Sequence, residues 1–137
     1  MHDRISFVNK KTSMVQQNAR HVILDIYFKS FPSALEDLNQ WREIGRKVLG
    51  RTGFNVHNEQ FHKFEPQGAS GFWLLSESHL SFHTWPEKKY VFVDLFSCGD
   101  HEKTELAADL MHEIFEKLGG TVRNKNIFKR GFLFEES

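Results

Sequence analysis

Side chains that could act as nucleophiles or acids gather in one stretch of this 137-residue chain, between residues 68 and 99. The stretch contains several serines, the histidines His79 and His83, and Cys98, the only cysteine. A serine hydroxyl or a cysteine thiol becomes an effective nucleophile when a neighbouring imidazole removes its proton. These residue types therefore indicate nucleophilic or acid–base chemistry in this part of the chain.

Two familiar kinds of site do not fit this stretch. His79 and His83 are four positions apart, which suits metal binding on a helix, but Pro86 and the Ser, Thr and aromatic content favour an extended chain. In a strand the two positions lie ~13 Å apart, too far to share one ion, so no metal site is expected. No G-x-x-x-x-G-K or G-x-G-x-x-G phosphate loop occurs. A nucleophilic pair of Cys98 with His83 stays open, because spacing alone does not establish it.

The overall composition narrows the class of protein. Lysine plus arginine and aspartate plus glutamate both number 18, so the formal net charge is zero and no nucleic-acid partner is expected. No apolar run approaches the ~20 residues of a membrane helix, so no membrane span is expected, and no signal peptide either. The single cysteine excludes an intrachain disulfide and favours a reducing compartment, so we expect a cytoplasmic protein.

The periodicity of apolar residues predicts the elements that position the reactive stretch. Alternation over 21–28 indicates a half-buried strand. Ser33 is a candidate N-cap, with Glu36 completing a capping box, for a helix that ends at the glycines in 50–53. A second amphipathic helix is predicted over 102–118. Further strands are predicted over 54–64, 71–75, 80–85, 90–98 and 121–134, the last as one or two strands.

The order of these elements predicts an α+β fold. Strand, helix, strands, helix and strands follow one another, and hairpin-like links join the middle strands. This order favours a two-layer α/β sandwich, with an antiparallel sheet, helices on one face and two similar halves. Residues 1–19 are polar and aperiodic and are expected to form an N-terminal arm, disordered or packed on a partner. A single domain is expected over 20–137.

The reactive stretch resembles the prokaryotic S-adenosylmethionine decarboxylase family, and the resemblance extends from about Arg20 through the second helix. It is carried by identities and by spacing together: His83 follows Ser78 by five positions, Cys98 follows it by twenty, and Ser70 precedes it by eight. The two most similar segments are Ser-Glu-Ser-His-Leu-Ser-Phe-His-Thr-Trp-Pro-Glu at 76–87 and Asp-Leu-Phe-Ser-Cys-Gly at 94–99.

The resemblance implies that the chain cleaves itself between Glu77 and Ser78, giving residues 1–77 and 78–137. Ser78 would attack the carbonyl of Glu77 and convert the amide into an ester. His83 would then remove the α-proton of Ser78, and β-elimination would release Glu77 as a new C-terminus. Ser70 would assist through a hydrogen bond. Tautomerisation and loss of ammonia would leave a pyruvoyl group, the self-generated cofactor, at the start of the second fragment.

The resemblance also implies that the processed chain decarboxylates S-adenosylmethionine for polyamine, and specifically spermidine, biosynthesis. The pyruvoyl group would form a Schiff base with the substrate amine and accept the electron pair left by carbon dioxide. Cys98 would be the proton donor. Phe64 and Trp85 would flank the adenine ring of S-adenosylmethionine, and Glu87 would accept hydrogen bonds from the ribose hydroxyls. A homodimer of processed protomers is expected, with each pocket near the subunit interface.

The chain departs from the family pattern at several positions, which leaves two alternatives open. Lys88 and Lys89 stand where family members commonly carry Tyr-Gly, and Glu65 and Gln67 replace residues that are usually apolar or aromatic. These changes favour an alternative substrate, a basic amino acid such as ornithine or arginine. A further alternative is an unprocessed, non-catalytic regulatory homologue. The presence of the whole processing and catalytic set disfavours this regulatory alternative, because a non-catalytic subunit has no chemical need for Ser70, Ser78, His83 and Cys98 together.

Overall fold

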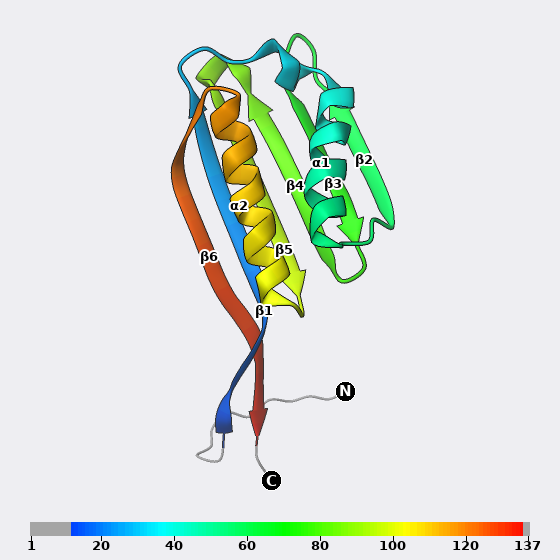
Figure 1. Cartoon of the computed structure of the whole chain (residues 1–137), viewed down its shortest axis with the longest axis vertical. Helices are drawn as coiled ribbons and strands as arrows, with labels where there is room; N and C mark the ends of the chain where they lie inside the picture. Colours follow the sequence, from blue (N-terminus) through cyan, green and yellow to red (C-terminus); the bar gives the residue numbers. More distant parts are fainter. Residues whose placement is uncertain (1–11, 136–137) are drawn as a thin grey trace.

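The structure, a computed structural model, describes residues 12–135, and they form one six-stranded antiparallel sheet covered by two helices (Figure 1). The strands lie side by side in the order β2-β3-β4-β5-β1-β6. In chain order the elements are β1 (Thr12–Phe28), a 3-10 helix (Ser33–Glu36), α1 (Leu38–Thr52), β2 (Asn58–Lys63), β3 (Ala69–Leu75), β4 (Ser78–Trp85), a second 3-10 turn (Pro86–Lys88), β5 (Tyr90–Cys98), α2 (His101–Lys117) and β6 (Gly120–Glu135).

The connections place both helices on the same face of the sheet (Figure 1). Every neighbouring pair of strands is antiparallel, so β1 runs parallel to β2 and β5 runs parallel to β6. Each of these parallel pairs is joined by a crossover through a helix, α1 in the first case and α2 in the second. The two-layer α+β sandwich predicted from the order of elements is therefore confirmed.

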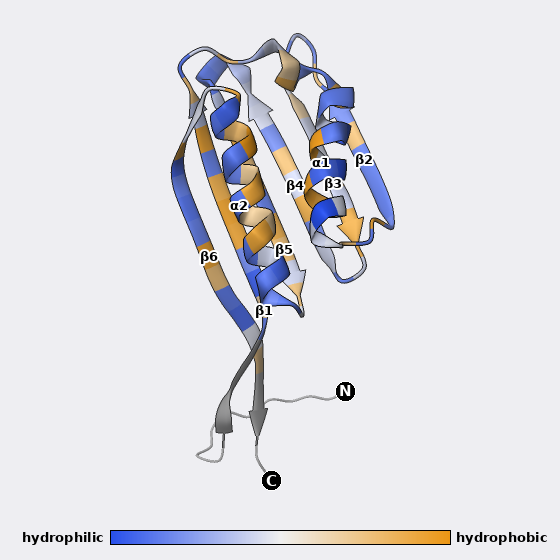
Figure 2. Cartoon of the chain, viewed as in Figure 1, coloured by the Kyte–Doolittle hydropathy of each residue, from blue (hydrophilic) through white to orange (hydrophobic). Residues whose placement is uncertain are grey.

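The core lies between the sheet and the helices. The alternate residues of β1 predicted to share one face, Val22, Leu24, Ile26 and Phe28, are all fully buried there. The helices turn their apolar sides to the same layer, as the hydropathy colouring shows (Figure 2). Trp41 of α1 stacks on Phe82 of β4 with ring centroids 3.8 Å apart. This packing fixes β4, the strand that carries Ser78, His79 and His83.

None of the helices in the described residues covers the opposite side of the sheet, called the open face below (Figure 1). Residues that alternate with the core positions point to it, and several of them are large, apolar and exposed. An ordinary monomer leaves such side chains scattered, whereas here they share one face. Those exposed at 38% to 66% of their full accessible surface include Phe72, Leu74, Phe92, Phe128 and Phe132.

Two local expectations need correction. The first strand begins at Thr12, because its N-terminal part pairs with the end of β6, so only residues 1–11 of the expected arm lie outside the described residues. Asp37, not Ser33, caps α1: its side chain accepts a hydrogen bond from the Asn39 amide at 2.9 Å. The final segment, predicted as one or two strands, forms the single strand β6.

The displaced N-cap has a tertiary cause. Ser33–Glu36 form a 3-10 turn before the helix, and the Glu36 carboxylate is bonded elsewhere. It accepts hydrogen bonds from Lys63 Nζ and from the Gly68 amide, each at 3.1 Å. A side chain engaged with the β2–β3 loop is not available for a capping box.

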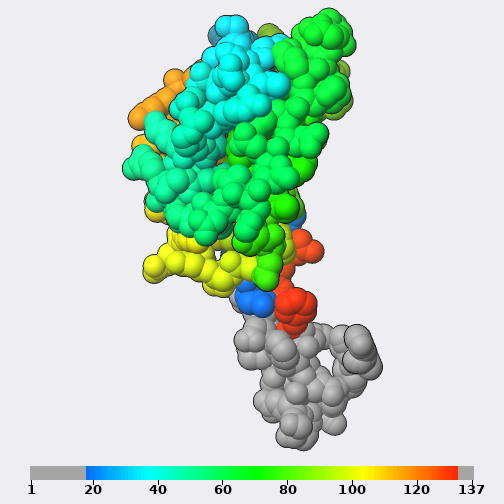
Figure 3. All heavy atoms as spheres, turned by 90° about the vertical axis from the view of Figure 1, so that its right-hand side faces the viewer, coloured from blue at the N-terminus to red at the C-terminus, as the bar shows by residue number. Residues whose placement is uncertain are grey.

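From the side, α1 lies close against the edge made by β2 and β3 (Figure 3). Arg42 of α1 forms an ion pair with Glu59 of β2 at 3.3 Å across this junction. Among the described residues, no helix is both long enough and apolar enough to cross a membrane.

Candidate active site

Ser78 is the first residue of β4 and follows a two-residue turn that closes the β3–β4 hairpin. Its side chain is only 7% exposed, and its Oγ accepts a hydrogen bond from the backbone amide of Cys98 at 3.2 Å. Cys98 ends β5 and is a free, partly buried thiol. The serine predicted to attack and the cysteine predicted to donate a proton therefore lie together at one end of the sheet.

The turn before Ser78 is conformationally unusual. Ser76 has φ = 59°, in the left-handed region that residues other than glycine rarely adopt. Leu75 pairs directly with Ser78, so only Ser76 and Glu77 connect the two strands. The bond predicted to be cleaved, between Glu77 and Ser78, thus joins a strained turn to a buried strand.

Ser70 and His83 form a second pair on neighbouring strands. They are directly opposite one another in β3 and β4, and Ser70 Oγ lies 2.6 Å from His83 Nδ1, a short hydrogen bond. Both side chains point to the open face, since the alternate residues of β4 from Ser78 to Thr84 are the buried ones. This is a hydroxyl–imidazole pair of the kind that moves protons.

A pocket of about 370 Å³ opens beside this pair. Phe64 comes from the end of β2, and Trp85 and Glu87 come from the end of β4 and the turn after it. The two rings are 46% and 47% exposed, so their faces are available for stacking. The lining consists of Phe64, Gln67, Gly68, Ser70, His83, Thr84, Trp85 and Glu87.

The predicted residues thus fall into two groups within one chain. Ser70, His83 and the three predicted substrate-binding residues share the pocket, whereas Glu77, Ser78 and Cys98 lie at the other end of β4. Five residues of strand separate Ser78 from His83, a distance of ~17 Å. An odd number of steps along a strand also turns the two side chains to opposite faces. Within one chain His83 does not reach Ser78.

A polar network that the sequence reasoning missed occupies the open face. Asp94 accepts hydrogen bonds from His21 Nε2 at 2.7 Å, from His79 Nε2 at 3.0 Å and from the Ser81 hydroxyl. Burial opposes the charged form of Asp94, but these hydrogen bonds outweigh it, so the pKa of Asp94 lies below its ordinary value of 3.8. The sequence signal that could have revealed this network is Asp94 itself, a carboxylate in a mostly apolar strand.

Histidine and carboxylate groups in this network are also of the types that bind divalent metals. The ligand atoms of His21, His79 and Asp94 lie within 4.8 Å of one another. However, Arg130 Nη1 lies 3.2 Å from His21 Nδ1, and a guanidinium only donates hydrogen bonds. Nδ1 therefore accepts, and Nε2 carries the hydrogen that is donated to Asp94. A protonated Nε2 does not ligate a metal, so the cluster is a hydrogen-bonded network.

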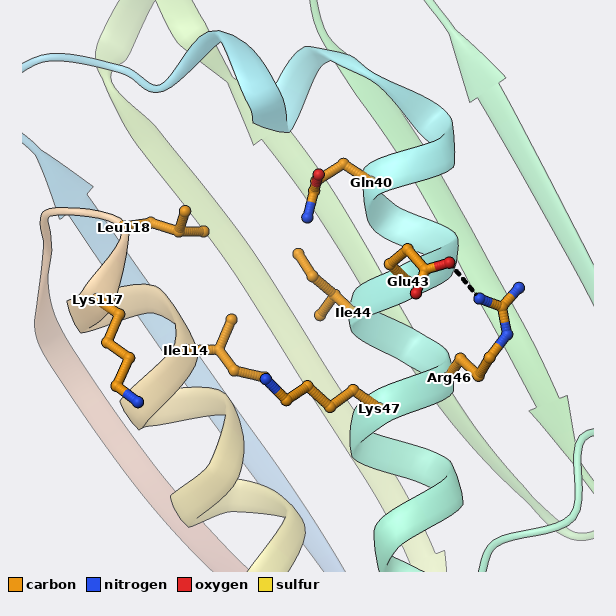
Figure 4. A pocket seen from close by; sticks show the side chains of 8 residues that line it. All are labelled: Gln40, Glu43, Ile44, Arg46, Lys47, Ile114, Lys117 and Leu118. Atoms are coloured by element: carbon orange, nitrogen blue, oxygen red, sulfur yellow. Dashed lines mark hydrogen bonds and ion pairs between the residues drawn. The ribbon is translucent and has the colours of Figure 1, made fainter.

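A second hollow, of about 540 Å³, lies away from these residues, between α1 and α2 (Figure 4). Ile44, Ile114 and Leu118 are its apolar lining residues, and the side chain of Lys47 reaches across from α1 toward Ile114. None of the predicted site residues lines it. The candidate active site is therefore the smaller pocket beside Ser70 and His83, together with the Ser78 turn.

An aromatic pocket with a hydroxyl–imidazole pair, on an α+β sandwich whose tight turn presents a buried serine, defines an enzyme that acts on a small molecule. The model of the S-adenosylmethionine decarboxylase family matches residues 20–130. The chain belongs to this family, which confirms the resemblance noted in its sequence.

Individual relatives agree with this assignment. The chain is 38% identical over 117 residues to the S-adenosylmethionine decarboxylase proenzyme of Carboxydothermus hydrogenoformans, covering 85% of this chain and 89% of that protein. It is 40% identical over 116 residues to the proenzyme of the same name from Pelotomaculum thermopropionicum, again covering 85% and 89%. The crystal structure of adenosylmethionine decarboxylase from Aquifex aeolicus superimposes with a TM-score of 0.75 at 27% identity, covering 89% of this chain and 98% of that one.

Proposed function

We propose that this chain is a proenzyme that cleaves itself between Glu77 and Ser78 and then decarboxylates S-adenosylmethionine. The observation that carries the proposal is the aromatic pocket, in which Phe64 and Trp85 lie beside the Ser70–His83 pair. Family membership and the relatives' printed name, S-adenosylmethionine decarboxylase proenzyme, support both parts of the proposal.

Self-cleavage uses groups at the β3–β4 turn. The Oγ of Ser78 attacks the carbonyl carbon of Glu77, the C–N bond breaks, and the hydroxyl proton moves to the released nitrogen. The Cys98 amide holds Oγ through its lone pair and leaves the hydroxyl hydrogen free to depart. His83 of the partner subunit then removes the α-proton of Ser78, with Ser70 of the partner subunit orienting the imidazole ring, and elimination breaks the new ester.

The sheet holds the two fragments together after cleavage. The first fragment, 1–77, contributes β1, and the second, 78–137, contributes β5 and β6. Because β1 lies between β5 and β6, its hydrogen bonds on both sides join one fragment to the other. The helices α1 and α2, one from each fragment, cover the same core.

The residues around Ser78 fit the pyruvoyl group that this family implies. A new N-terminus at the first residue of β4 remains paired to β5 within the sheet. A pyruvoyl group there supplies the electron-accepting carbonyl that decarboxylation of an amino acid requires. Cys98, the neighbour of Ser78 at the end of β5, supplies the proton that replaces carbon dioxide.

The pocket favours S-adenosylmethionine over a basic amino acid. Exposed rings of Phe64 and Trp85 provide flat surfaces for adenine and, through their π-electrons, for the sulfonium cation. Glu87 lines the same pocket and would accept hydrogen bonds from the ribose hydroxyls. Gln67 does line the pocket, but Glu65, the other residue that favoured ornithine or arginine, is not among the lining residues.

A homodimer would unite the two groups of site residues. Within one chain His83 lies ~17 Å along β4 from Ser78. If two open faces pack with their strands running in opposite directions, His83 of the partner subunit approaches Ser78, and each dimer contains two complete sites. The apolar side chains exposed on the open face are the surface that such packing would bury.

Two measurements test the proposal. Intact mass under denaturing, reducing conditions is expected to show fragments 1–77 and 78–137, the second lighter than a serine N-terminus would make it. Carbon dioxide release is then measured side by side with S-adenosylmethionine, ornithine and arginine. A single 16.1 kDa species would favour the unprocessed regulatory homologue. Processed protein that acts only on ornithine or arginine would overturn the substrate.

A further inference from the structure

His57 lies beside the turn that carries the cleavage bond, although it precedes that turn by about twenty residues. Its backbone amide donates a hydrogen bond to the Leu74 carbonyl at 2.7 Å. Its side-chain Nε2 lies 2.8 Å from Ser76 Oγ. The residue therefore contacts the hairpin at two points, one at the end of β3 and one within the turn itself.

Ser76 is the residue that needs such support. Its φ of 59° lies in the left-handed region, where an L side chain is disfavoured by contact between Cβ and the following carbonyl. Glycine would adopt this conformation without penalty, but the chain has serine here. A side-chain hydrogen bond from outside the turn offsets the cost and selects this conformation. The position of the Glu77 carbonyl depends on it, because Glu77 is the only residue between Ser76 and Ser78.

We propose that His57 is a positioning residue for self-cleavage, acting through Ser76 to hold the turn in the geometry in which Ser78 attacks Glu77. The inference rests on the proposed function. His57 touches neither of the reacting atoms and does not line the pocket. Once the Glu77–Ser78 bond is broken, Ser76 stands one residue from the new C-terminus. The contact therefore affects maturation and has no part in decarboxylation.

The test measures the rate of self-cleavage in the full-length chain. Wild type and variants are made by cell-free translation, stopped at successive times, and the intact chain is separated from the 78–137 fragment. Loss of one such hydrogen bond in His57→Ala is expected to slow cleavage about three- to tenfold. His57→Gln, whose amide also bonds a hydroxyl, is expected to restore most of the rate. Asn55→Ala, an exposed position in the same loop, serves as the matched control.

A second pair of variants shows whether the effect passes through Ser76. In a Ser76→Ala background, replacing His57 with Ala is expected to slow cleavage no further. Fully matured His57→Ala enzyme is expected to keep the wild-type kcat, KM and Tm. The inference is overturned if His57→Ala cleaves at the wild-type rate, or if its effect persists undiminished with Ser76→Ala. Wild type that never cleaves would instead refute the proposed function.

Discussion

At the scale of single residues, Cys98 contacts Ser78 through its backbone, and in the proposed mechanism its thiol would donate a proton to the substrate. The amide holds Ser78 Oγ, and that contact does not depend on the side chain. Replacing Cys98 with Ala is therefore expected to leave self-cleavage intact while decarboxylation falls about 10²- to 10⁴-fold, the usual contribution of a general acid. Intact mass measures the first outcome and carbon dioxide release the second. A Cys98→Ala variant that is processed and fully active would show that the thiol is not the proton donor.

Asp94 anchors the polar network of the open face, and its charge is expected to stabilise the fold. Asp94→Asn keeps the shape but loses a charged acceptor of three hydrogen bonds, so a loss of about 1–3 kcal/mol in the free energy of unfolding is expected at neutral pH. Urea unfolding measures this loss. Asp25→Asn, which alters a carboxylate whose bonding partner is the exposed amide of Asn124, is the control for a surface change.

The same residue gives a pH dependence of defined sign. Because folding lowers the pKa of Asp94 below 3.8, the folded chain binds fewer protons at this site than the unfolded chain in that range. Its stabilising contribution is complete above pH 3.8 and disappears as pH falls through the folded-state pKa. The difference between wild type and Asp94→Asn is therefore expected to shrink in acid. A difference that grows there would contradict the assignment.

At the scale of elements, the packing of α1 on the sheet depends on one small residue. A Cβ at Gly45 would overlap the buried indole ring of Trp73, whereas a Cβ at Gly50 would meet nothing within 4 Å. Gly45→Ala is expected to destabilise the protein by about 1–3 kcal/mol through overpacking. Gly50→Ala, in the same helix, is expected to stabilise it by about 0.5–1 kcal/mol through helix propensity alone. Thermal unfolding of both variants checks the contrast, and equal shifts would contradict it.

The beginning of α1 provides a second element-scale prediction. Asp37 caps the helix through its side chain, and Ser33 makes no capping bond to it. Asp37→Ala is therefore expected to cost about 0.5–2 kcal/mol of unfolding free energy, and Ser33→Ala close to none. Urea titration distinguishes them. A larger loss from Ser33→Ala than from Asp37→Ala would contradict this assignment and support Ser33 as the cap, as the sequence pattern favoured.

Local pattern accounts for the elements that were predicted well. The strand over 90–98 and the helix over 102–118 were found within one residue of their ends, because strict alternation and i+4 spacing are local signals. The cap of α1 was missed because Glu36 is engaged by Lys63 and Gly68, which are distant in sequence. Thr12 was missed as a strand start because its pairing partner lies at the opposite end of the chain.

For the candidate site too, part was predicted from the sequence and part was missed. The resemblance to the family named five of the residues that line the pocket: Phe64, Ser70, His83, Trp85 and Glu87. Spacing did not reveal that Ser78 and His83 are held apart by a rigid strand. Nor did it reveal that His79 and Asp94 meet His21, which comes from a strand about sixty residues earlier. Such contacts depend on sheet order, which no short pattern encodes.

At the scale of the whole molecule, the sheet has two unlike faces. Helices α1 and α2 cover one face and bury its central strands, and the other face presents aromatic residues around a hydrogen-bonded polar network. A formal net charge of zero leaves no net repulsion between copies and so favours association weakly. Packing two open faces would bury the exposed aromatics and, in the opposed orientation, would bring His83 of the partner subunit to Ser78.

This arrangement predicts that two inactive variants restore one another. Ser78→Ala lacks the nucleophile and His83→Ala lacks the base, so neither is expected to mature when expressed alone. When both are expressed together, a mixed dimer contains one site in which the intact Ser78 of the His83→Ala chain faces His83 of the partner subunit. We expect cleavage of the His83→Ala chain alone, in up to about half of its copies, because random pairing places that fraction in mixed dimers.

Mass spectrometry identifies which chain is cut, since each substitution changes the mass of only one product. Co-expression of His83→Ala with Ser70→Ala is the matched control, because Ser70 and His83 come from the same chain and share one pocket. Each pocket of this mixed dimer carries one of the two substitutions, so no intact site forms and no rescue is expected. If His83→Ala stays uncut beside Ser78→Ala, His83 acts within its own chain, and β4 must rearrange before Ser78 can react.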